Sequence, residues 1–136
     1  MEETILEKKS ISTTQQDIEC FFKTHDAKYV AEDAVFINMG TGEETKGREA
    51  IAGMLQYFYH VAFEAKAEIK NIIITEDKAL LEADFKGKHI GEFAGMQPSN
   101  KEVNVPLCVS YDIEDGLIKQ GRVYMLADVL MRQLQG

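Results

Sequence analysis

The histidine best placed for chemistry, His89, lies where a predicted strand turns into a glycine-containing loop. It follows Gly87, and Glu92 comes three residues later. A neutral imidazole can act as a base or hydrogen-bond donor near pH 7, and pairing with Glu92 would favour acid/base chemistry. The alternative for His89 is a structural hydrogen bond to the neighbouring loop. Asn38, at the end of another predicted strand, can either bind a carbonyl through its amide or cap the turn that follows.

A second set of functional side chains lies near the C-terminus. Arg122, Tyr124, Leu126 and Asp128 are spaced two residues apart, in a strand predicted from Leu117 to about Asp128. Alternate residues of a strand point to the same face, so this spacing places a cation, a phenol and a carboxylate together. The alternatives are a surface carboxylate for Asp128, a rim salt bridge for Arg122, and a core aromatic with a satisfied hydroxyl for Tyr124.

Apolar spacing predicts helices in the first half of the chain. A first helix is expected over 13–24 with a Ser-Thr cap, and residues 1–11 either extend it or fray. His25 closes this helix, where a charged imidazole would interact favourably with the helix dipole. A short helix over 28–31 and a strand over 34–39 follow. The clearest helix opens at Gly47 and ends near Phe63, and its apolar face contains Met54 and Phe58, which we take as candidate substrate-binding residues.

The second half of the chain predicts antiparallel strands, over 64–75, 78–88, 103–112 and 117–128. Residues 103–112 alternate strictly between apolar and polar, as in a half-buried strand, and Asp115-Gly116 is a strong hairpin signal. Helices followed by an antiparallel meander are typical of the α+β class. We expect a single domain over 1–136, in which a twisted sheet curls over the amphipathic helix and leaves a cone-shaped cavity.

Composition excludes several functions. The 15 Lys and Arg against 23 Asp and Glu give a net charge of −8, which disfavours nucleic-acid binding because an acidic surface repels phosphate. The N-terminus has no apolar signal-peptide core, and no stretch approaches the ~20 apolar residues of a membrane span. We therefore expect a cytoplasmic protein without membrane or nucleic-acid partners. The two cysteines are interpreted as buried apolar residues rather than a disulfide pair.

Motifs for metals and cofactors are absent from the sequence. The three histidines have no His-x-x-x-His spacing, so no sequence-local metal site is indicated. The segment from Gly42 to Arg48 only faintly resembles a phosphate loop, and its acidic pair would repel phosphate. No dinucleotide fingerprint and no Gly-x-Ser-x-Gly motif occur. We expect neither a metal nor an organic cofactor.

Three stretches carry a family resemblance: Asp33-Ala-Val-Phe-Ile-Asn38 with Gly47-Arg-Glu-Ala-Ile51; Gly87-Lys-His89-Ile-Gly91-Glu-Phe93 with Gly95, Pro98 and Lys101; and Asp115-Gly116, Arg122-Val-Tyr124, Leu130 and Gln133-Leu134. They resemble the SnoaL-like polyketide cyclase and ester cyclase family, whose fold is the nuclear-transport-factor-2-like cone. The second and third stretches are similar to the family's Gly-Thr-His-x-Gly and Arg-x-Tyr-x-Asp signatures. The resemblance covers nearly the whole chain from about Asp17.

The resemblance implies an intramolecular aldol ring closure on a polyketide, without a metal or organic cofactor. A C–H between two carbonyls is acidic enough for a carboxylate to act as general acid/base. Arg122 and Tyr124 match the family pattern, but the aspartate position is Leu126, and Asp128 lies two residues further along the same face. We take Asp128 and His89 as the candidate catalytic residues. The candidate substrate-binding residues are Arg122, Tyr124, Asn38, Glu92, Leu126, Phe58 and Met54.

Three functions remain open at this point. The first is a cofactor-independent acid/base enzyme acting on a small apolar carbonyl compound. The second is a non-catalytic pocket protein for a small hydrophobic ligand, which Leu126 at the family aspartate position favours. The third is an interaction module whose cone is filled by its own side chains. Homodimers are common in the family, so a homodimer is expected.

Overall fold

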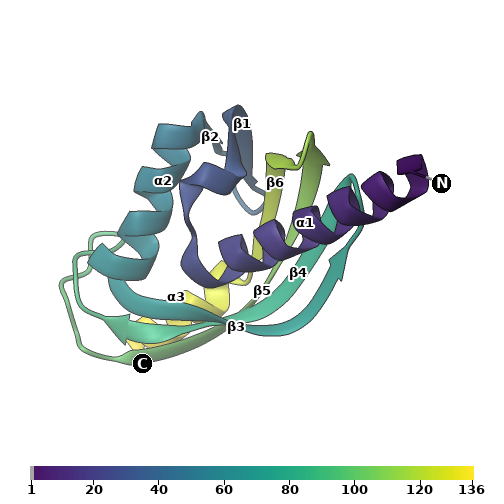
Figure 1. Cartoon of the computed structure of the whole chain (residues 1–136). Coiled ribbons are helices and arrows are strands. Elements are labelled where there is room, and N and C mark those ends of the chain that lie inside the picture. Colours follow the sequence, from purple (N-terminus) through teal and green to yellow (C-terminus); the bar gives the residue numbers. More distant parts are fainter. Residues whose placement is uncertain (1) are drawn as a thin grey trace.

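The computed structural model describes residues 2–136, with side chains described from residue 13 onward. Its elements, in chain order, are α1 (Glu2–Thr24), the 3-10 turn η1 (Ala27–Tyr29), β1 (Val30–Asn38), β2 (Glu44–Lys46), α2 (Arg48–Gln56), the π-helix η2 (Tyr57–Val61), β3 (Phe63–Ile74), β4 (Lys78–His89), β5 (Glu102–Glu114), β6 (Leu117–Met125) and α3 (Ala127–Gln135). Figure 1 shows α1 and α2 on one side of a single curved sheet. The expected α+β cone is confirmed.

The sheet has six strands in the order β2-β1-β6-β5-β4-β3. The predicted meander from β3 to β6 is antiparallel throughout. The expectation of a wholly antiparallel sheet was wrong, because β1 pairs with β6 in parallel. Apolar alternation indicates which face of a strand is buried, but not the direction of a partner that is distant in sequence. The short strand β2, which the sequence did not reveal, pairs with β1 as a hairpin.

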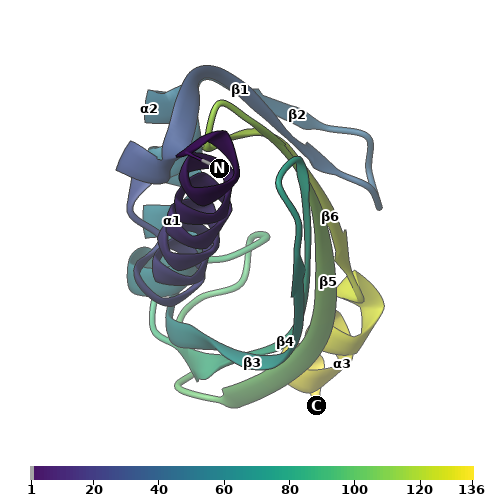
Figure 2. The ribbon, with the colours of Figure 1, turned by 45° about the vertical axis from the view of Figure 1, so that its right-hand side comes forward.

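The sheet bends strongly around the helices and stays open (Figure 2). One cause is Gly87 of β4, where a Cβ atom would clash with the carbonyl oxygen of Glu64 and with Ala65 on β3. A second cause is the register shift between Ile69 and Asn71, because a bulge increases the local twist. The concave face therefore wraps around a volume that α1, α2 and η2 cover.

Helix α1 runs without a break from Glu2, so residues 2–11 extend the predicted helix, which is one of the two alternatives, and there is no cap at Thr13. Its inward residues Ile18, Phe21 and Phe22 are at most 1% exposed and form part of the core with β1, β4 and β5. Among the described residues, no helix is both long and apolar enough to cross a membrane.

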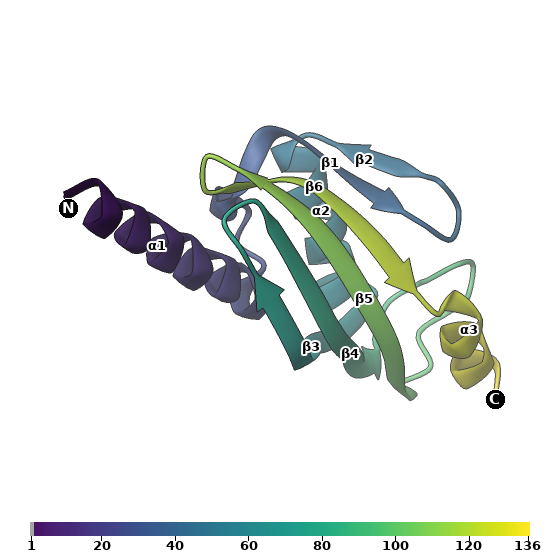
Figure 3. The same cartoon turned by 90° about the vertical axis from the view of Figure 1, so that its right-hand side faces the viewer.

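The predicted last strand was too long at its C-terminal end. Strand β6 stops at Met125, and α3 follows and packs beside β5 beyond the end of β6 (Figure 3). The Gln133 side chain bonds both the backbone N–H and the carbonyl of Asn104, at 2.8 and 2.9 Å. Leu130 and Leu134, one helical turn apart, are buried on the inward side of α3.

Candidate ligand-binding site

A cavity of about 210 Å³ lies between the concave sheet face, the end of α1 and the α2–η2 segment. Its walls are mostly apolar and include Met54 and Phe58, two of the predicted substrate-binding residues. The complete lining is Phe21, His25, Phe36, Ile37, Asn38, Glu43, Thr45, Met54, Leu55, Phe58, Tyr59, Leu81, Phe85, Leu107, Val109, Tyr111, Val123 and Met125. An apolar cavity with a few convergent polar groups is the usual form of a small-molecule site. The cone is therefore not filled by its own side chains.

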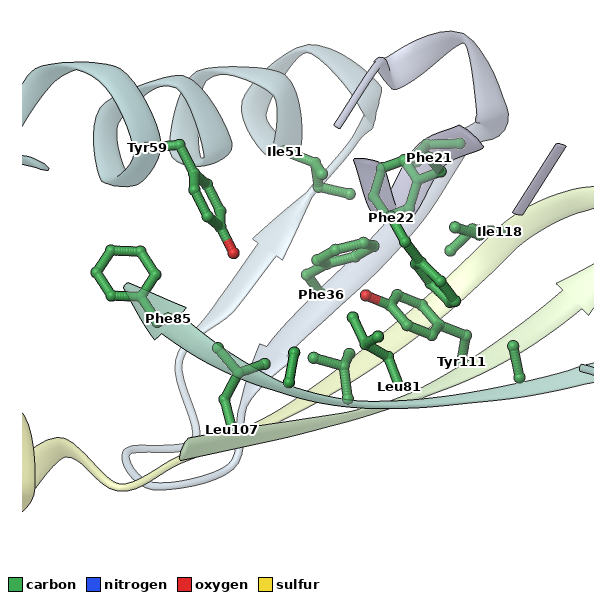
Figure 4. Close-up of a cluster of buried hydrophobic side chains, with 14 of the residues drawn as sticks. Phe21, Phe22, Phe36, Ile51, Tyr59, Leu81, Phe85, Leu107, Tyr111 and Ile118 are labelled. Carbon is green, nitrogen blue, oxygen red and sulfur yellow. The ribbon is translucent and has the colours of Figure 1, made fainter. Parts of the chain in front are cut away.

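Two tyrosine hydroxyls face this cavity. Tyr59 comes from η2 and Tyr111 from β5, and both oxygens point toward the space between Phe36, Phe85 and Leu107 (Figure 4). Neither hydroxyl has a hydrogen-bond partner among the described residues. Buried phenols normally find a partner within the protein, so this pair is available to a bound ligand.

Both phenols remain protonated near neutral pH. Burial raises the pKa of Tyr59 to about 12. Burial also raises the pKa of Tyr111 well above its ordinary value, and the nearby Tyr59 adds to this effect. Since a neutral phenol donates its hydrogen, the cavity offers two donors to a ligand oxygen.

Tyr59 lies in a π-helical turn at the end of α2. The Ala62 N–H bonds the carbonyl of Tyr57 at 2.7 Å, five residues back, as in a π-helix. Phe58 and Tyr59 both reach the cavity wall, four residues after Met54 and Leu55, which line it from the same helix face. Single π turns inside helices are frequent at functional sites.

His25 is a lining side chain of the site whose pKa is lowered. Its backbone has φ of 56°, a left-handed conformation that ends α1, and its N–H bonds the carbonyl of Phe21 at 2.7 Å. Glycine usually occupies such a position, because a side chain there is mildly strained. The imidazole stacks on Tyr59, with ring centroids 4.1 Å apart.

The imidazole of His25 is neutral at physiological pH. Burial, and secondarily the nearby His60, lowers the pKa of His25 to about 4. The expected favourable interaction of a charged His25 with the helix dipole is therefore wrong, because desolvation outweighs the dipole. A neutral imidazole has one ring nitrogen free to accept a proton.

Asn38 and Glu43 line the cavity from the β1–β2 hairpin. The side-chain oxygen of Asn38 accepts hydrogen bonds from the N–H groups of Gly40 and Thr41, at 2.9 and 3.3 Å. Asn38 thus caps its turn, which is one of the two alternatives given by the sequence. Its NH₂ group remains as a donor at the cavity wall. Glu43 is an exposed carboxylate at this rim.

His89 and Glu92 are not part of the cavity lining. His89 is 1% exposed, and its Nδ1 lies 2.9 Å from Ser99 Oγ in the following loop. This geometry agrees with the structural alternative for His89. The Glu92 side chain is exposed, and only its backbone carbonyl makes an inward contact, accepting the Tyr57 hydroxyl at 2.7 Å.

Arg122 and Tyr124 lie on the outer face of β6. Their neighbours Val123 and Met125 line the cavity, so the alternation places Arg122 and Tyr124 on the opposite side. Arg122 forms an ion pair with Asp112, at 2.8 Å, and lowers the pKa of that carboxyl group. Tyr124 is 49% exposed.

Leu126 and Asp128 do not continue this strand face. Leu126, 50% exposed, begins α3, and Asp128 lies in the first helical turn with its side chain 79% exposed. A carboxylate in the first helical turn interacts favourably with the helix dipole. The Asp128 carboxylate also lies 3.7 Å from Arg132, one turn later. The cation, phenol and carboxylate predicted on one strand face therefore do not lie together. Arg122 and Tyr124 face away from the cavity, and Asp128 lies in α3 because β6 ends at Met125.

A second, larger hollow of about 780 Å³ lies on the outer sheet face near α3. It is broad and open, and it is lined by charged side chains including Lys66, Lys86, Glu64 and Glu102. Its lysines are solvated or paired, as Lys86 is with Glu68. The enclosed cavity, with its unpartnered hydroxyls, is the better candidate for ligand binding.

Two of the three central residues could have been identified from sequence periodicity. Tyr111 lies in the strictly alternating stretch, in phase with buried Val105 and Val109, so its inward direction was predictable. Tyr59 lies four residues after Leu55 and eight after Ile51, in phase with the apolar face of the helix, so its inward direction was also predictable. His25 was interpreted only as a helix-end residue.

The open mixed sheet and its covering helices form a ketosteroid isomerase-like cone, and the cavity lies inside it. The sequence model of the SnoaL-like polyketide cyclase family matches residues 19–134. The chain belongs to this family. Comparison of the sequence with curated proteins gave no significant match.

Solved structures agree with this assignment at the level of fold. A candidate SnoaL-like polyketide cyclase from Jannaschia sp. CCS1 superposes with a TM-score of 0.81 at 15% identity, covering 93% of this chain and 94% of that one. IdmH, a candidate polyketide cyclase from Streptomyces antibioticus, superposes with a TM-score of 0.68 at 20% identity, covering 92% of this chain and 98% of that one. A protein of ketosteroid isomerase-like fold from Catenulispora acidiphila, solved with trimethylamine, superposes with a TM-score of 0.63 at 19% identity, covering 79% of this chain and 78% of that one.

Proposed function

We propose that this protein is a cofactor-independent acid/base enzyme of the cyclase type, acting on a small apolar carbonyl compound in the enclosed cavity. The observation that carries the proposal is the pair of unpartnered hydroxyls, Tyr59 and Tyr111, beside a neutral His25 in an otherwise apolar cavity. Donors aimed at a developing oxyanion in a water-poor site are a major source of catalysis.

His25 takes the part that the resemblance assigned to an aspartate. With a pKa of about 4, its imidazole has the proton affinity of an ordinary carboxylate, so it is matched to the same acidic C–H between two carbonyls. The base is neutral before the reaction, and its burial in an apolar wall therefore costs less than the burial of Asp would.

The reaction balances without any other reactant. The imidazole nitrogen of His25 takes the proton from carbon, and the resulting enolate oxygen accepts hydrogen bonds from the hydroxyls of Tyr59 and Tyr111. The enolate carbon attacks a second carbonyl carbon of the same molecule, forming the C–C bond. The new alkoxide takes the proton back from the imidazolium, which restores the enzyme.

The test is catalysed exchange of the central C–H of acetylacetone with deuterium, followed by NMR. Wild type should accelerate exchange, and His25→Asn should lose roughly 10²-fold or more of the acceleration. Asn tolerates the left-handed backbone, so this variant keeps the fold. His60→Asn removes the neighbouring exposed histidine and is the matched control, with exchange expected to change less than about twofold. Binding without exchange in wild type would instead favour the non-catalytic pocket protein.

We also propose that two copies of the chain pair through the outer sheet face. Tyr124 and Leu126 are half exposed there, beside Pro106 and Cys108 of β5. Exposed apolar groups of this kind favour association. Sedimentation should show a dimer that Leu126→Glu weakens, whereas Val61→Glu, at an equally exposed apolar residue of η2, should leave it intact. A monomeric wild type would refute this assembly.

A further inference from the structure

We propose that the cavity selects a neutral ketone of one or two fused rings, and that it rejects three-ring and larger compounds. The inference rests on the proposed function in treating this cavity as the reaction site. It goes further in fixing the size, shape and charge of the ligand. Each of these properties follows from a different feature of the lining.

The volume sets the number of atoms. An engineered protein cavity of about 150 Å³ holds benzene, so by proportion about 210 Å³ holds roughly eight to ten non-hydrogen atoms. That is the size of a substituted benzene or of two small fused rings. A linear three-ring ketone exceeds it by about half.

The two ends of the cavity are fixed by packed aromatic side chains. At one end Phe36 lies against Phe21 and Tyr111, with ring centroids 6.5 and 6.0 Å away. Directly beneath it is Gly121, where even a Cβ atom would come within 3.0 Å of the Phe36 ring. Phe36 is 3% exposed, and it cannot move back without displacing the core.

At the other end stands Phe85, which is 2% exposed. Its ring packs against Phe63 and Tyr59, at 5.3 and 5.2 Å. Figure 4 shows Phe85 and Phe36 on opposite sides of the space toward which the hydroxyls point. A third ring lying along the line between Phe36 and Phe85 would have to displace one of these buried side chains, so they limit the length of a ligand in that direction.

The polar groups set the charge and the functional group. Among the described residues that line the cavity, none is Lys or Arg, and Glu43 at the rim is acidic. A carboxylate ligand would therefore enter without a counter-charge, which is strongly unfavourable in an apolar site. The protonated hydroxyls of Tyr59 and Tyr111 require an acceptor, and a ketone oxygen supplies one.

The experiment measures dissociation constants of the full-length chain for four compounds by ligand-observed NMR. Indanone has two rings and a ketone, indane lacks the oxygen, indane carboxylate adds a charge, and fluorenone has three rings and a ketone. Without a size limit fluorenone would bind more tightly than indanone, because it buries more apolar surface. We expect the reverse, with indanone at least about tenfold tighter than each of the others.

A variant with a larger cavity tests whether cavity volume causes the weaker binding of fluorenone. Met54 lines the cavity from α2 and is half-buried, so its truncation should not unfold the protein. Met54→Ala should tighten fluorenone binding by about tenfold, while Met54→Leu, which keeps the volume, should behave as wild type. Retained binding of indanone reports that each variant is folded.

Two results would overturn the size limit: fluorenone binding to wild type as tightly as indanone in competition for the same site, or no binding of any two-ring compound. Equal affinity for indane and indanone would refute the proposal that Tyr59 and Tyr111 donate hydrogen bonds to the ketone oxygen. Failure of the proposed catalysis has a different signature, in which indanone is selected normally but acetylacetone exchange is not accelerated.

Discussion

Acidification from about pH 6.5 toward pH 4 should destabilise this protein through one residue, His25. The pKa of His25 is lowered from 6.5 to about 4 by burial. In the unfolded chain the imidazole takes up a proton near pH 6.5, whereas in the folded protein it does so only near pH 4. Stability contributed by this group is therefore complete above about pH 6.5 and is lost as the pH falls toward 4.

The size of the effect follows from the shift. At 1.36 kcal/mol per pH unit, a displacement from 6.5 to about 4 corresponds to about 3 kcal/mol of unfolding free energy. This is a large share of the 5–15 kcal/mol typical of a domain. With a urea dependence of about 1–3 kcal/mol per molar, the unfolding midpoint should fall by roughly 1–3 M between pH 7.5 and pH 4.

The assay is urea unfolding of wild type and His25→Asn across this pH range, and the difference between the two is the measured quantity. All other groups cancel in that difference, including Asp112, whose pKa is lowered by Arg122 and Lys78 and whose stability contribution is lost only at lower pH. The difference should shrink by about 3 kcal/mol as pH falls. A difference independent of pH would refute the burial of a neutral His25.

Three other substitutions probe the same site. Tyr111→Phe should leave the unfolding midpoint unchanged or slightly higher, because its hydroxyl has no partner among the described residues, while indanone affinity falls about tenfold; urea titration and NMR measure the two. Gly121→Ala should cost roughly 1–3 kcal/mol and weaken indanone binding, since its Cβ meets the Phe36 ring, whereas Gly53→Ala in open space on α2 should stabilise by up to about 1 kcal/mol. Asp128→Asn should change exchange of acetylacetone by less than about twofold, as its side chain is exposed in α3; a large loss would restore it as the base.

Periodicity predicted the elements of this fold well, because a half-buried strand and a one-sided helix each leave a pattern in sequence. The alternation of 103–112 identified β5, and the apolar stripe of α2 placed Met54 and Phe58 correctly at the cavity. The parallel pairing of β1 with β6 left no such pattern, because it depends on how two distant segments meet. Similarly, the start of α3 at Ala127 depends on a turn at Leu126 that spacing of two could not reveal.

The site was harder to predict because its polar groups come from segments that are far apart in the sequence. His25 sits at a left-handed helix end, a position that helical periodicity does not mark. Tyr59 and Tyr111 follow the periodicity of their helix and strand, but nothing in that periodicity shows that they meet. The grouping of these side chains with His25 at one cavity depends on how the sheet curves around the helices.

Leu126, at the family aspartate position, lies away from the cavity. On β6 the residues in phase with it, Arg122 and Tyr124, face outward, and the residues that do reach the cavity, Val123 and Met125, are apolar. A carboxylate at residue 126 would begin a helix half exposed to solvent, without a direct path to the cavity along this strand face. Loss of an aspartate there therefore says little about the enclosed cavity of this chain. If that cavity is catalytic, its base must come from another element, and the neutral imidazole at the end of α1 is the described lining group whose pKa the cavity itself has shifted into the range of a carboxylate.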